Sequence, residues 1–286
     1  MKWLCAPLVQ ILSQRISDKT RIRKVNIVRY LLSRISSLVF GLLGLKIEKA
    51  KNDRSDLNVI YRELFEANDQ LVIFDVGANV GQSVWRFKRL FRNSSVHSFE
   101  PIGENVKQIK TRYSGDENLI VNQTAVGEYQ GRETLLEYAN NAHSSFHRLL
   151  PDTIWLKKRS RQKRESPGTY KKKETPVDVI TLDSYCEDKG IEGIDILKID
   201  TQGYEDKVLN GSKGLLRKGG VKLVELELIF SPIYERVANF SDIEKNLVNN
   251  GYRLVGLNTP GNLARDYIWQ SDVVYARDDI FKKLTG

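Results

Sequence analysis

Three acidic residues directly follow segments that we predict to be strands, at the positions where an α/β protein usually carries its chemistry. The acids are Asp75, Glu100 and Asp200, and the predicted strands are 71–74, 95–99 and 194–199. Short apolar runs rich in β-branched residues are typical of parallel strands that are buried on both faces. Since the carboxyl ends of parallel strands meet at one edge of a sheet, where open α/β sheets bind ligands, we expect these acids on one rim.

The chain then turns tightly after Asp75, with the spacing Asp75-x-Gly77-x-Asn79-x-Gly81. Glycine lets a chain turn and approach a ligand without a Cβ in the way, and the N–H groups of the next helix face the ligand. The spacing differs from the G-x-G-x-x-G fingerprint of dinucleotide-binding proteins. It is similar to the first motif of class I S-adenosylmethionine-dependent methyltransferases, although glycine turns also join strands to helices for structural reasons alone.

The second acid, Glu100, lies 25 residues beyond Asp75 and precedes Pro101, which ends the strand. In βαβ geometry an acid at this position accepts both ribose hydroxyls of a nucleoside. The loop 123–127, after a third strand, is expected to close over the adenine ring. The predicted cofactor-binding residues are Asp75, Gly77, Ala78, Asn79, Gly81, Glu100, Pro101, Asn122, Ala125 and Thr201.

The remaining strands follow from apolar runs of similar length, and 286 residues suit one α/β domain with an appendage. We expect strands at 119–122, 221–228, 252–257 and 273–275, a further strand at 175–182 and a short hairpin over 127–138 with its turn at Gln130-Gly131. In the strand 221–228, Glu225 and Glu227 lie on one side by the two-residue period. Buried acids are costly unless they are paired or solvated, so this side is expected to face the cleft.

The net charge of +9 is spread unevenly along the chain. Residues 1–54 carry a net charge of +9 and residues 157–173 carry +8, which leaves about −8 for the rest. We therefore predict a basic N-terminal extension, 1–54, and a domain, 55–286, that contains a basic mobile insertion, 157–173. The charge of the insertion suits an anionic substrate, a membrane or RNA, and it equally suits a solvated loop.

Apolar residues recur at helical spacing between positions 27 and 43. Arg29 and Arg34 interrupt every apolar stretch long enough to cross a membrane. An amphipathic helix here would either rest on an anionic membrane or pack on protein as a lid or dimer arm, and we favour the second. A signal peptide at residues 3–12 is disfavoured because the apolar run is short.

The two cysteines, Cys5 and Cys186, lie far apart and form no C-x-x-C motif. With only three histidines, the sequence suggests neither a disulfide framework nor a zinc site. We therefore expect a cytoplasmic protein, with peripheral contact to the inner face of the membrane as the alternative.

From about Ile60 to Tyr275 the chain resembles the FkbM family of methyltransferases. The motifs that carry this resemblance are VIFDVGANVGQ, SFEP, the serine pair of NNAHSSF, VITLDSY, ILKIDTQGYEDKVLNG, LVELEL followed by Tyr234, and WQSDVVY. The resemblance implies an α/β Rossmann-like fold with a seven-stranded, mostly parallel sheet, an antiparallel last strand and helices on both faces. It also implies S-adenosyl-L-methionine as methyl donor and O-methylation of a sugar, glycolipid, polysaccharide or natural product. Many members carry Glu where this chain has Gln202, and the basic insertion is unusual.

A hydroxyl is a poor nucleophile for a methyl group unless a base or a metal assists it. Asp200 is the first candidate for the base, and His143 and Glu227 are alternates; the need for a metal stays open. Asp200 would equally suit a role as cofactor or metal ligand, and His143 lies in a polar stretch typical of a surface loop. The expected partner is a hydroxylated small molecule or a glycan.

Three other functions compete with this prediction. An oxidoreductase with a nicotinamide cofactor is disfavoured by the absent fingerprint. A nucleic-acid methyltransferase would use the basic insertion, but the motif of amide-type N-methylation needs two adjacent prolines and the chain has none. A non-catalytic module that only binds the cofactor is the third alternative.

Overall fold

The computed structural model describes residues 56–286 except for 139–140, 154–155, 158–170 and 259–269. The predicted N-terminal extension, 1–54, lies outside the described residues, so its boundary and its role stay predictions. None of the helices in the described part of the chain combines the length and hydrophobicity needed to cross a membrane.

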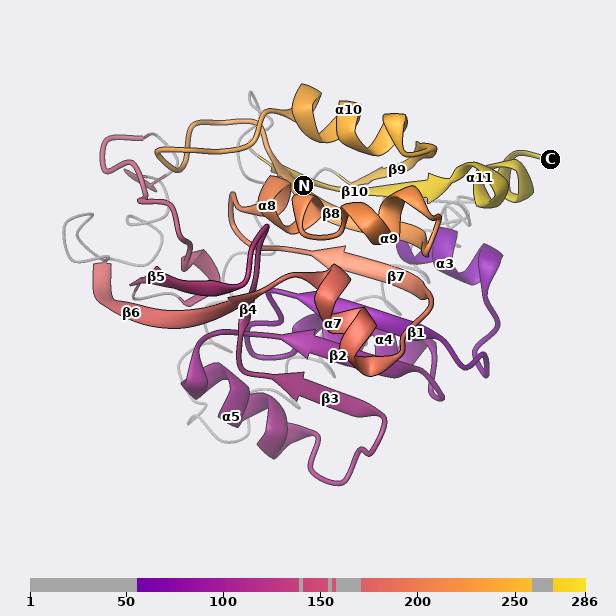
Figure 1. The fold of residues 1–286 in the computed structure, drawn as a ribbon, viewed down its shortest axis with the longest axis horizontal. Helices are drawn as coiled ribbons and strands as arrows, with labels where there is room; N and C mark the ends of the chain where they lie inside the picture. The colour runs from indigo at the N-terminus through magenta and orange to yellow at the C-terminus, as the bar shows by residue number, and fades with distance from the viewer. Residues whose placement is uncertain (1–55, 139–140, 154–155, 158–170, 259–269) are drawn as a thin grey trace, which may run out of the picture. The chain divides into compact units, whose positions relative to one another are not determined.

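A seven-stranded sheet forms the centre of the described domain (Figure 1). Each pair of neighbouring strands is parallel, except that β10 runs antiparallel to both β8 and β9. The order across the sheet is β3 (Leu119–Asn122), β2 (Ser95–Phe99), β1 (Val72–Val76), β7 (Ile194–Ile199), β8 (Val221–Ile229), β10 (Gln270–Arg277) and β9 (Tyr252–Asn258). This topology confirms the predicted fold class.

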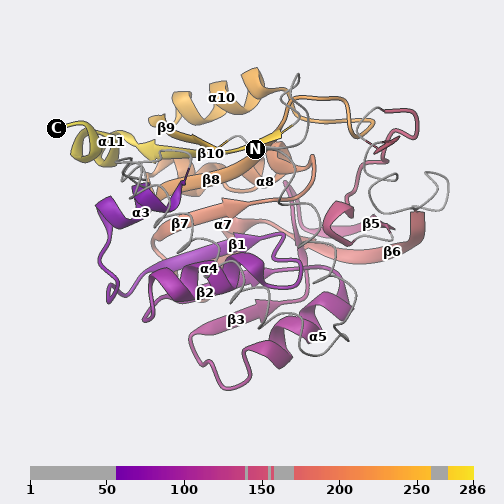
Figure 2. The ribbon, with the colours of Figure 1, turned by 180° about the vertical axis from the view of Figure 1, so that it is seen from behind.

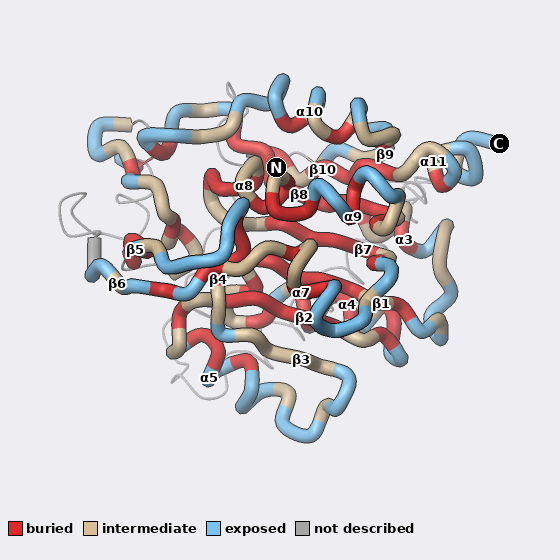
Figure 3. Tube along the Cα trace, in the orientation of Figure 1, coloured by how far each residue is buried: buried red, intermediate tan, exposed pale blue. Residues whose placement is uncertain are grey.

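Helices cover both faces of the sheet because successive strand residues point to opposite sides. Phe74 belongs to a core shared with helices on one face, whereas Ile73 belongs to the core on the other. The helices on the first face are α7 (Leu182–Lys189), α8 (Glu205–Asn210), α9 (Lys213–Arg217) and α10 (Phe240–Asn249). Those on the second are α3 (Asn58–Leu64), α4 (Gln82–Leu90) and α11 (Asp278–Thr285), and α5 (Gly103–Arg112) follows β2 (Figure 2). The central strands are accordingly buried along most of their length (Figure 3).

A smaller sheet lies in the chain between β3 and β7. It consists of β4 (Ala125–Val126), β6 (Lys171–Ile180) and β5 (Gly131–Tyr138), with β6 in the middle. The predicted hairpin over 127–138 is therefore wrong, because β5 pairs along its whole length with β6, which is distant in the sequence. Burial of Leu135, Val177 and Val179 in a shared cluster favours this pairing over a local turn.

Two predicted boundaries near β6 also need correction. Residues 171–173 belong to the strand, so the predicted mobile insertion, 157–173, does not extend to its expected end; residues 158–170 lie outside the described residues. The strand β6 ends at Ile180, two residues before its expected end at residue 182. The helix α7 begins at Leu182 instead, because the Thr181 side chain caps it by accepting from the Ser184 amide.

Candidate active site

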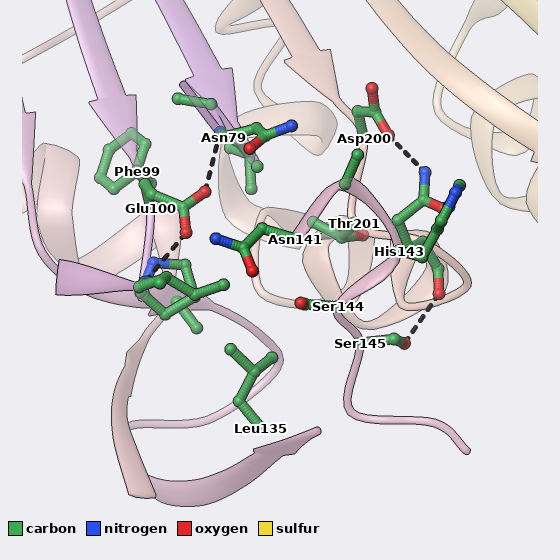
Figure 4. A pocket seen from close by; sticks show the side chains of 18 of the residues that line it. Asn79, Phe99, Glu100, Leu135, Asn141, His143, Ser144, Ser145, Asp200 and Thr201 are labelled. Atoms are coloured by element: carbon green, nitrogen blue, oxygen red, sulfur yellow. Dashed lines mark hydrogen bonds between the residues drawn. The ribbon is translucent and has the colours of Figure 1, made fainter. Parts of the chain in front are cut away.

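A cavity of about 310 Å³ lies at the carboxyl edge of the central sheet (Figure 4). Of the predicted site residues, the ones that line it are Gly77, Ala78, Asn79, Glu100, Pro101, Ala125, His143, Asp200, Thr201 and Glu227. The lining residues outside the predicted set include Gln82, Ser83, Phe99, Ile102, Leu135, Asn141, Ser144, Ser145, Gln202 and Gln270. The structure thus brings most of the predicted cofactor residues and all three candidate bases to one cavity.

The glycine turn after β1 is fixed by its close approach to the end of β7. Gly77 has a φ of +83°, and a Cβ on it would lie 2.0 Å from the carbonyl oxygen of Asp200. Asn79 also adopts a positive φ, +49°, and its amide donates to Glu100 Oε2 at 2.8 Å. Only glycine at position 77 therefore lets the turn after β1 lie this close to the backbone of Asp200 at the end of β7.

Glu100 is held at one end of the cavity by donors from the two flanking segments. Its carboxylate accepts from the amides of Asn79 and Ile102, at 2.8 and 2.9 Å, and from Asn105 Nδ2 at 3.3 Å. Burial raises the pKa of this carboxyl to about 7, although the hydrogen bonds act in the opposite direction. The apolar side chains of Phe99 and Leu135 lie at the same end (Figure 4). A carboxylate beside apolar walls fits the ribose and adenine of the predicted cofactor.

Three of the predicted cofactor residues do not line the cavity. Asp75 lies within β1, fully buried, where neither carboxylate oxygen has a hydrogen-bond partner among the described residues, and burial raises its pKa to about 6. Gly81 is the residue before α4, and its positive φ of +82° lets the chain turn into the helix. Asn122 instead donates from its side chain to the carbonyl of Ser98 in the neighbouring strand, at 3.1 Å. Gly81 and Asn122 are thus placed to shape the turn before α4 and the end of β3.

Asp200 lies at the opposite end of the cavity, and a neighbouring lysine already balances its negative charge. Lys198 Nζ donates to its Oδ2 at 3.0 Å, and Gln202 Nε2 donates to its Oδ1 at 2.9 Å. Burial alone would raise the pKa of this carboxyl, but the Lys198 charge and the Gln202 hydrogen bond outweigh burial and hold it below its usual range. This arrangement suits a permanently ionised group.

Glu227 lies next to Asp200 and has a different environment. Its two oxygens accept from Gln202 Nε2 at 2.7 Å and from Gln270 Nε2 at 2.6 Å, and no lysine or arginine is hydrogen-bonded to it among the described residues. Burial, and then the negative charge of Asp200, raises the pKa of Glu227 well above its usual value. The pKa values of Asp200 and Glu227 are therefore shifted in opposite directions.

Glu225, the other acid on this side of β8, does not face the cavity as expected. Arg86 Nη2 lies 2.8 Å from both of its carboxylate oxygens, and the Tyr61 hydroxyl donates to Oε2. Glu225 is only 1% exposed, so this contact with α3 and α4 supplies the pairing that a buried acid needs.

Gln202 connects the acids to the loops that cover this end of the cavity. Its φ is +56°, its carbonyl accepts from Ser145 Oγ at 2.7 Å, and its Oε1 accepts from the Tyr234 hydroxyl at 3.0 Å. Glu205 keeps the turn in shape by accepting from the amides of Thr201 and Gly203. In the sequence, Gln202 stands out only as a departure from the family pattern. Tyr234 and Ser145 belong to recognisable motifs, but the motifs do not predict their contacts with Gln202.

His143 ends the short 3₁₀ helix η1 (Asn141–His143) and lines the cavity beside Asp200 (Figure 4). It is 9% exposed, which makes a surface loop the wrong description, and its carbonyl accepts from the Tyr234 hydroxyl at 3.1 Å. At the other end of η1, Asn141 Nδ2 donates to Asn105 Oδ1 at 3.1 Å. Among the described residues, no cluster of three or more His, Cys, Asp or Glu side chains is arranged to hold a metal ion.

Comparison with known proteins gives matches for the sequence and the fold. A model of the methyltransferase FkbM domain matches residues 75–254. The 2-O-methyltransferase NoeI of Sinorhizobium fredii is 26% identical over 168 residues, which are 57% of this chain; the matched part spans 65% of that relative.

Two solved structures illustrate the similarity in fold. Fibrillarin of Aeropyrum pernix, crystallised with natively bound S-adenosyl-L-methionine, is 10% identical with a TM-score of 0.41, covering 78% of this chain and 76% of that one. Magnesium protoporphyrin IX methyltransferase of Synechocystis, with the same bound molecule, is 10% identical with a TM-score of 0.42, covering 77% and 76%.

Proposed function

Because this chain belongs to the methyltransferase FkbM domain family, we propose that it transfers a methyl group from S-adenosylmethionine to a hydroxyl of a sugar or another hydroxyl-rich acceptor. The described part of the chain is an S-adenosylmethionine-dependent methyltransferase domain of the class I fold. The nature of the acceptor, and the oxygen as its reacting atom, are the proposal.

The observation that carries the proposal is the arrangement of one cavity with Glu100 at one end and the carboxyls of Asp200 and Glu227 at the other. When bound, S-adenosylmethionine supplies an electrophilic methyl group on a positively charged sulfur. Glu100 would accept hydrogen bonds from the ribose hydroxyls, as its fixed orientation allows. The turn at Gly77 lies against the end of β7, and the residues after it, Ala78 and Asn79, line the cavity where the cofactor would bind.

The acceptor end of the cavity supports a hydroxylated substrate. Side chains of Ser144 and Ser145 line it with hydroxyl groups, next to His143 (Figure 4). Such groups both donate and accept, which is what sugar hydroxyls require. The relative named as a 2-O-methyltransferase supports oxygen as the methylated atom. These residues would orient the acceptor, and orientation is the main requirement of an in-line displacement.

Calorimetric titration with S-adenosylhomocysteine tests the cofactor, with NADH titrated in parallel. We expect micromolar binding of the first and no binding of the second. Labelled methyl transfer is then measured on methyl glycosides of hexoses and N-acetylhexosamines, with RNA as the competing acceptor. Binding of NADH alone would refute the proposal, as would transfer to RNA in preference to every glycoside. Tight binding with no transfer to any acceptor would identify a cofactor-binding module.

A further inference from the structure

We propose that Glu227 is the general base of the methyl transfer and that Gln202 is the residue that positions it against Asp200. The inference rests on the proposed function, since it assigns the group that receives the proton of the acceptor hydroxyl. It changes the order of the candidate bases, because Asp200 was the first choice from the sequence.

The hydrogen bonds of Asp200 leave it unsuited to accept a proton. One of its oxygens receives the Lys198 ammonium and the other receives the Gln202 amide. Lys198 is only 7% exposed, so protonation of Asp200 would leave a buried cation without its anion. Asp200 therefore holds a fixed negative charge beside the reacting groups.

Glu227 receives only neutral donors, the amides of Gln202 and Gln270. It lines the same cavity and is 8% exposed. Each carboxylate oxygen has two acceptor positions, so one amide on each oxygen leaves room for a hydroxyl. Of the two acids at the acceptor end of the cavity, Asp200 and Glu227, Glu227 is thus the one that can gain a proton without breaking an ion pair.

The orientation of Gln202 follows from its contact with Asp200. An ionised carboxylate only accepts, so the group of Gln202 that faces Asp200 is the amide nitrogen, and Oε1 lies on the side of the Tyr234 hydroxyl. The two amide hydrogens of Gln202 then face Asp200 and Glu227, one to each. A single neutral side chain therefore holds two carboxyls together, and a glutamate at this position would add a third negative charge.

The chemical step balances with these groups. The acceptor oxygen forms a bond to the methyl carbon while the bond from that carbon to sulfur breaks, and the bonding pair stays on sulfur. The hydroxyl proton passes to the Glu227 carboxylate and is later released to water. Nothing is oxidised or reduced, and no further reactant is needed.

The charged and titratable groups around Glu227 determine how its activity depends on pH. The charges that act on it are those of Asp200 and Lys198 on β7 and its end, Asp272 on β10 and Glu205 on α8, with the Tyr234 hydroxyl in the loop after β8; His143 of η1 lines the same cavity beside Asp200. Acids outnumber cations in this set, and burial acts in the same direction, so the proton of Glu227 is lost only at raised pH. We therefore expect kcat to rise with pH through the pKa of Glu227.

The test compares Glu227→Gln, Asp200→Asn and Gln202→Glu, with Gln130→Glu as a control that adds the same charge at an exposed turn. Glu227→Gln should lower kcat by about 10²- to 10⁴-fold with S-adenosylhomocysteine affinity unchanged within threefold. Gln202→Glu should move the rise of kcat to higher pH, Asp200→Asn should move it to lower pH, and the control should leave it in place.

A second readout is independent of turnover. Carboxyl ¹³C NMR of the protein labelled at glutamate should show one resonance that is lost in Glu227→Gln and that titrates well above the usual range of glutamate. In Gln202→Glu its midpoint should move to higher pH. A normal midpoint for this resonance, or a Glu227→Gln enzyme within tenfold of wild-type kcat, would overturn the inference. If the wild type binds S-adenosylhomocysteine but methylates no glycoside, the proposed function fails while the titration still decides the state of Glu227.

Discussion

Replacing Gly77 by alanine tests whether the close contact between the turn after β1 and the backbone of Asp200 is needed for cofactor binding. The new Cβ would lie 2.0 Å from the carbonyl oxygen of Asp200 and 2.8 Å from its carbonyl carbon, so the two backbones must separate until the shorter contact reaches at least 3.4 Å. The positive φ costs alanine about 1–2 kcal/mol, and displacing packed backbone costs about 1–3 kcal/mol more.

We therefore expect Gly77→Ala to lower the free energy of unfolding by about 2–5 kcal/mol. Gly115→Ala is the matched control, because its φ is +87° and a Cβ there meets no atom within 4 Å. It should lose only the conformational part, about 1–2 kcal/mol. Urea denaturation gives both values, and calorimetry with S-adenosylhomocysteine should show at least a tenfold loss of affinity in Gly77→Ala alone. Equal losses of stability and unchanged affinity in both variants would refute the reasoning.

Three further changes test other parts of the structure. Arg86→Met should lower the free energy of unfolding by about 3–5 kcal/mol, because Glu225 stays buried without its cation; Arg132→Ala, in an exposed ion pair, should cost less than about 1 kcal/mol. Burial lowers the pKa of His97 to about 4, so only the unfolded chain takes up this proton between about pH 6.5 and 4. Stability should therefore fall as pH falls through that range, and His97→Phe should reduce the slope in urea titrations. Since the pKa of Glu100 is about 7, affinity for S-adenosylhomocysteine should weaken below pH 7, and Glu100→Gln should bind about 1.5–3 kcal/mol more weakly with no such pH dependence.

Each of these expectations has an outcome that contradicts it. Equal destabilisation by Arg86→Met and Arg132→Ala would mean that burial of the ion pair has no energetic consequence. An unchanged pH slope in His97→Phe would assign the acid sensitivity to other groups. Wild-type affinity that is constant from pH 5 to 8 would show that the ionised Glu100 carboxylate does not bind the ribose.

Several strands of the central sheet were predictable to within a residue or two, because their β-branched and apolar residues are bounded by turn residues. Ser95–Phe99, Leu119–Asn122 and Ile194–Ile199 match the structure at both ends. The small sheet was not predictable in the same way. Its pairing of β5 with β6 depends on burial of residues such as Leu135 and Val179, which lie far apart in the sequence.

For the site, spacing located Glu100 and Asp200 because the ends of parallel strands share one edge of the sheet. It misplaced Glu225, because the two-residue period fixes the side of a strand but not the depth along it: Glu227 reaches the cavity, whereas Glu225 meets Arg86 beneath it. The role of Gln202 depends on contacts with Tyr234 and Glu227, and no local pattern predicts these.

The chain enters the small sheet through β4 and leaves it through the end of β6. Ala125 and Val126 pair with Val179 and Ile180, so the chain leaves the domain and returns to it through adjacent, hydrogen-bonded strands. The ends of the intervening segment are thus fixed at contact distance whatever its length, and an added loop costs little closure entropy. A change in the length of the segment between these strands therefore leaves the register of the central sheet unchanged.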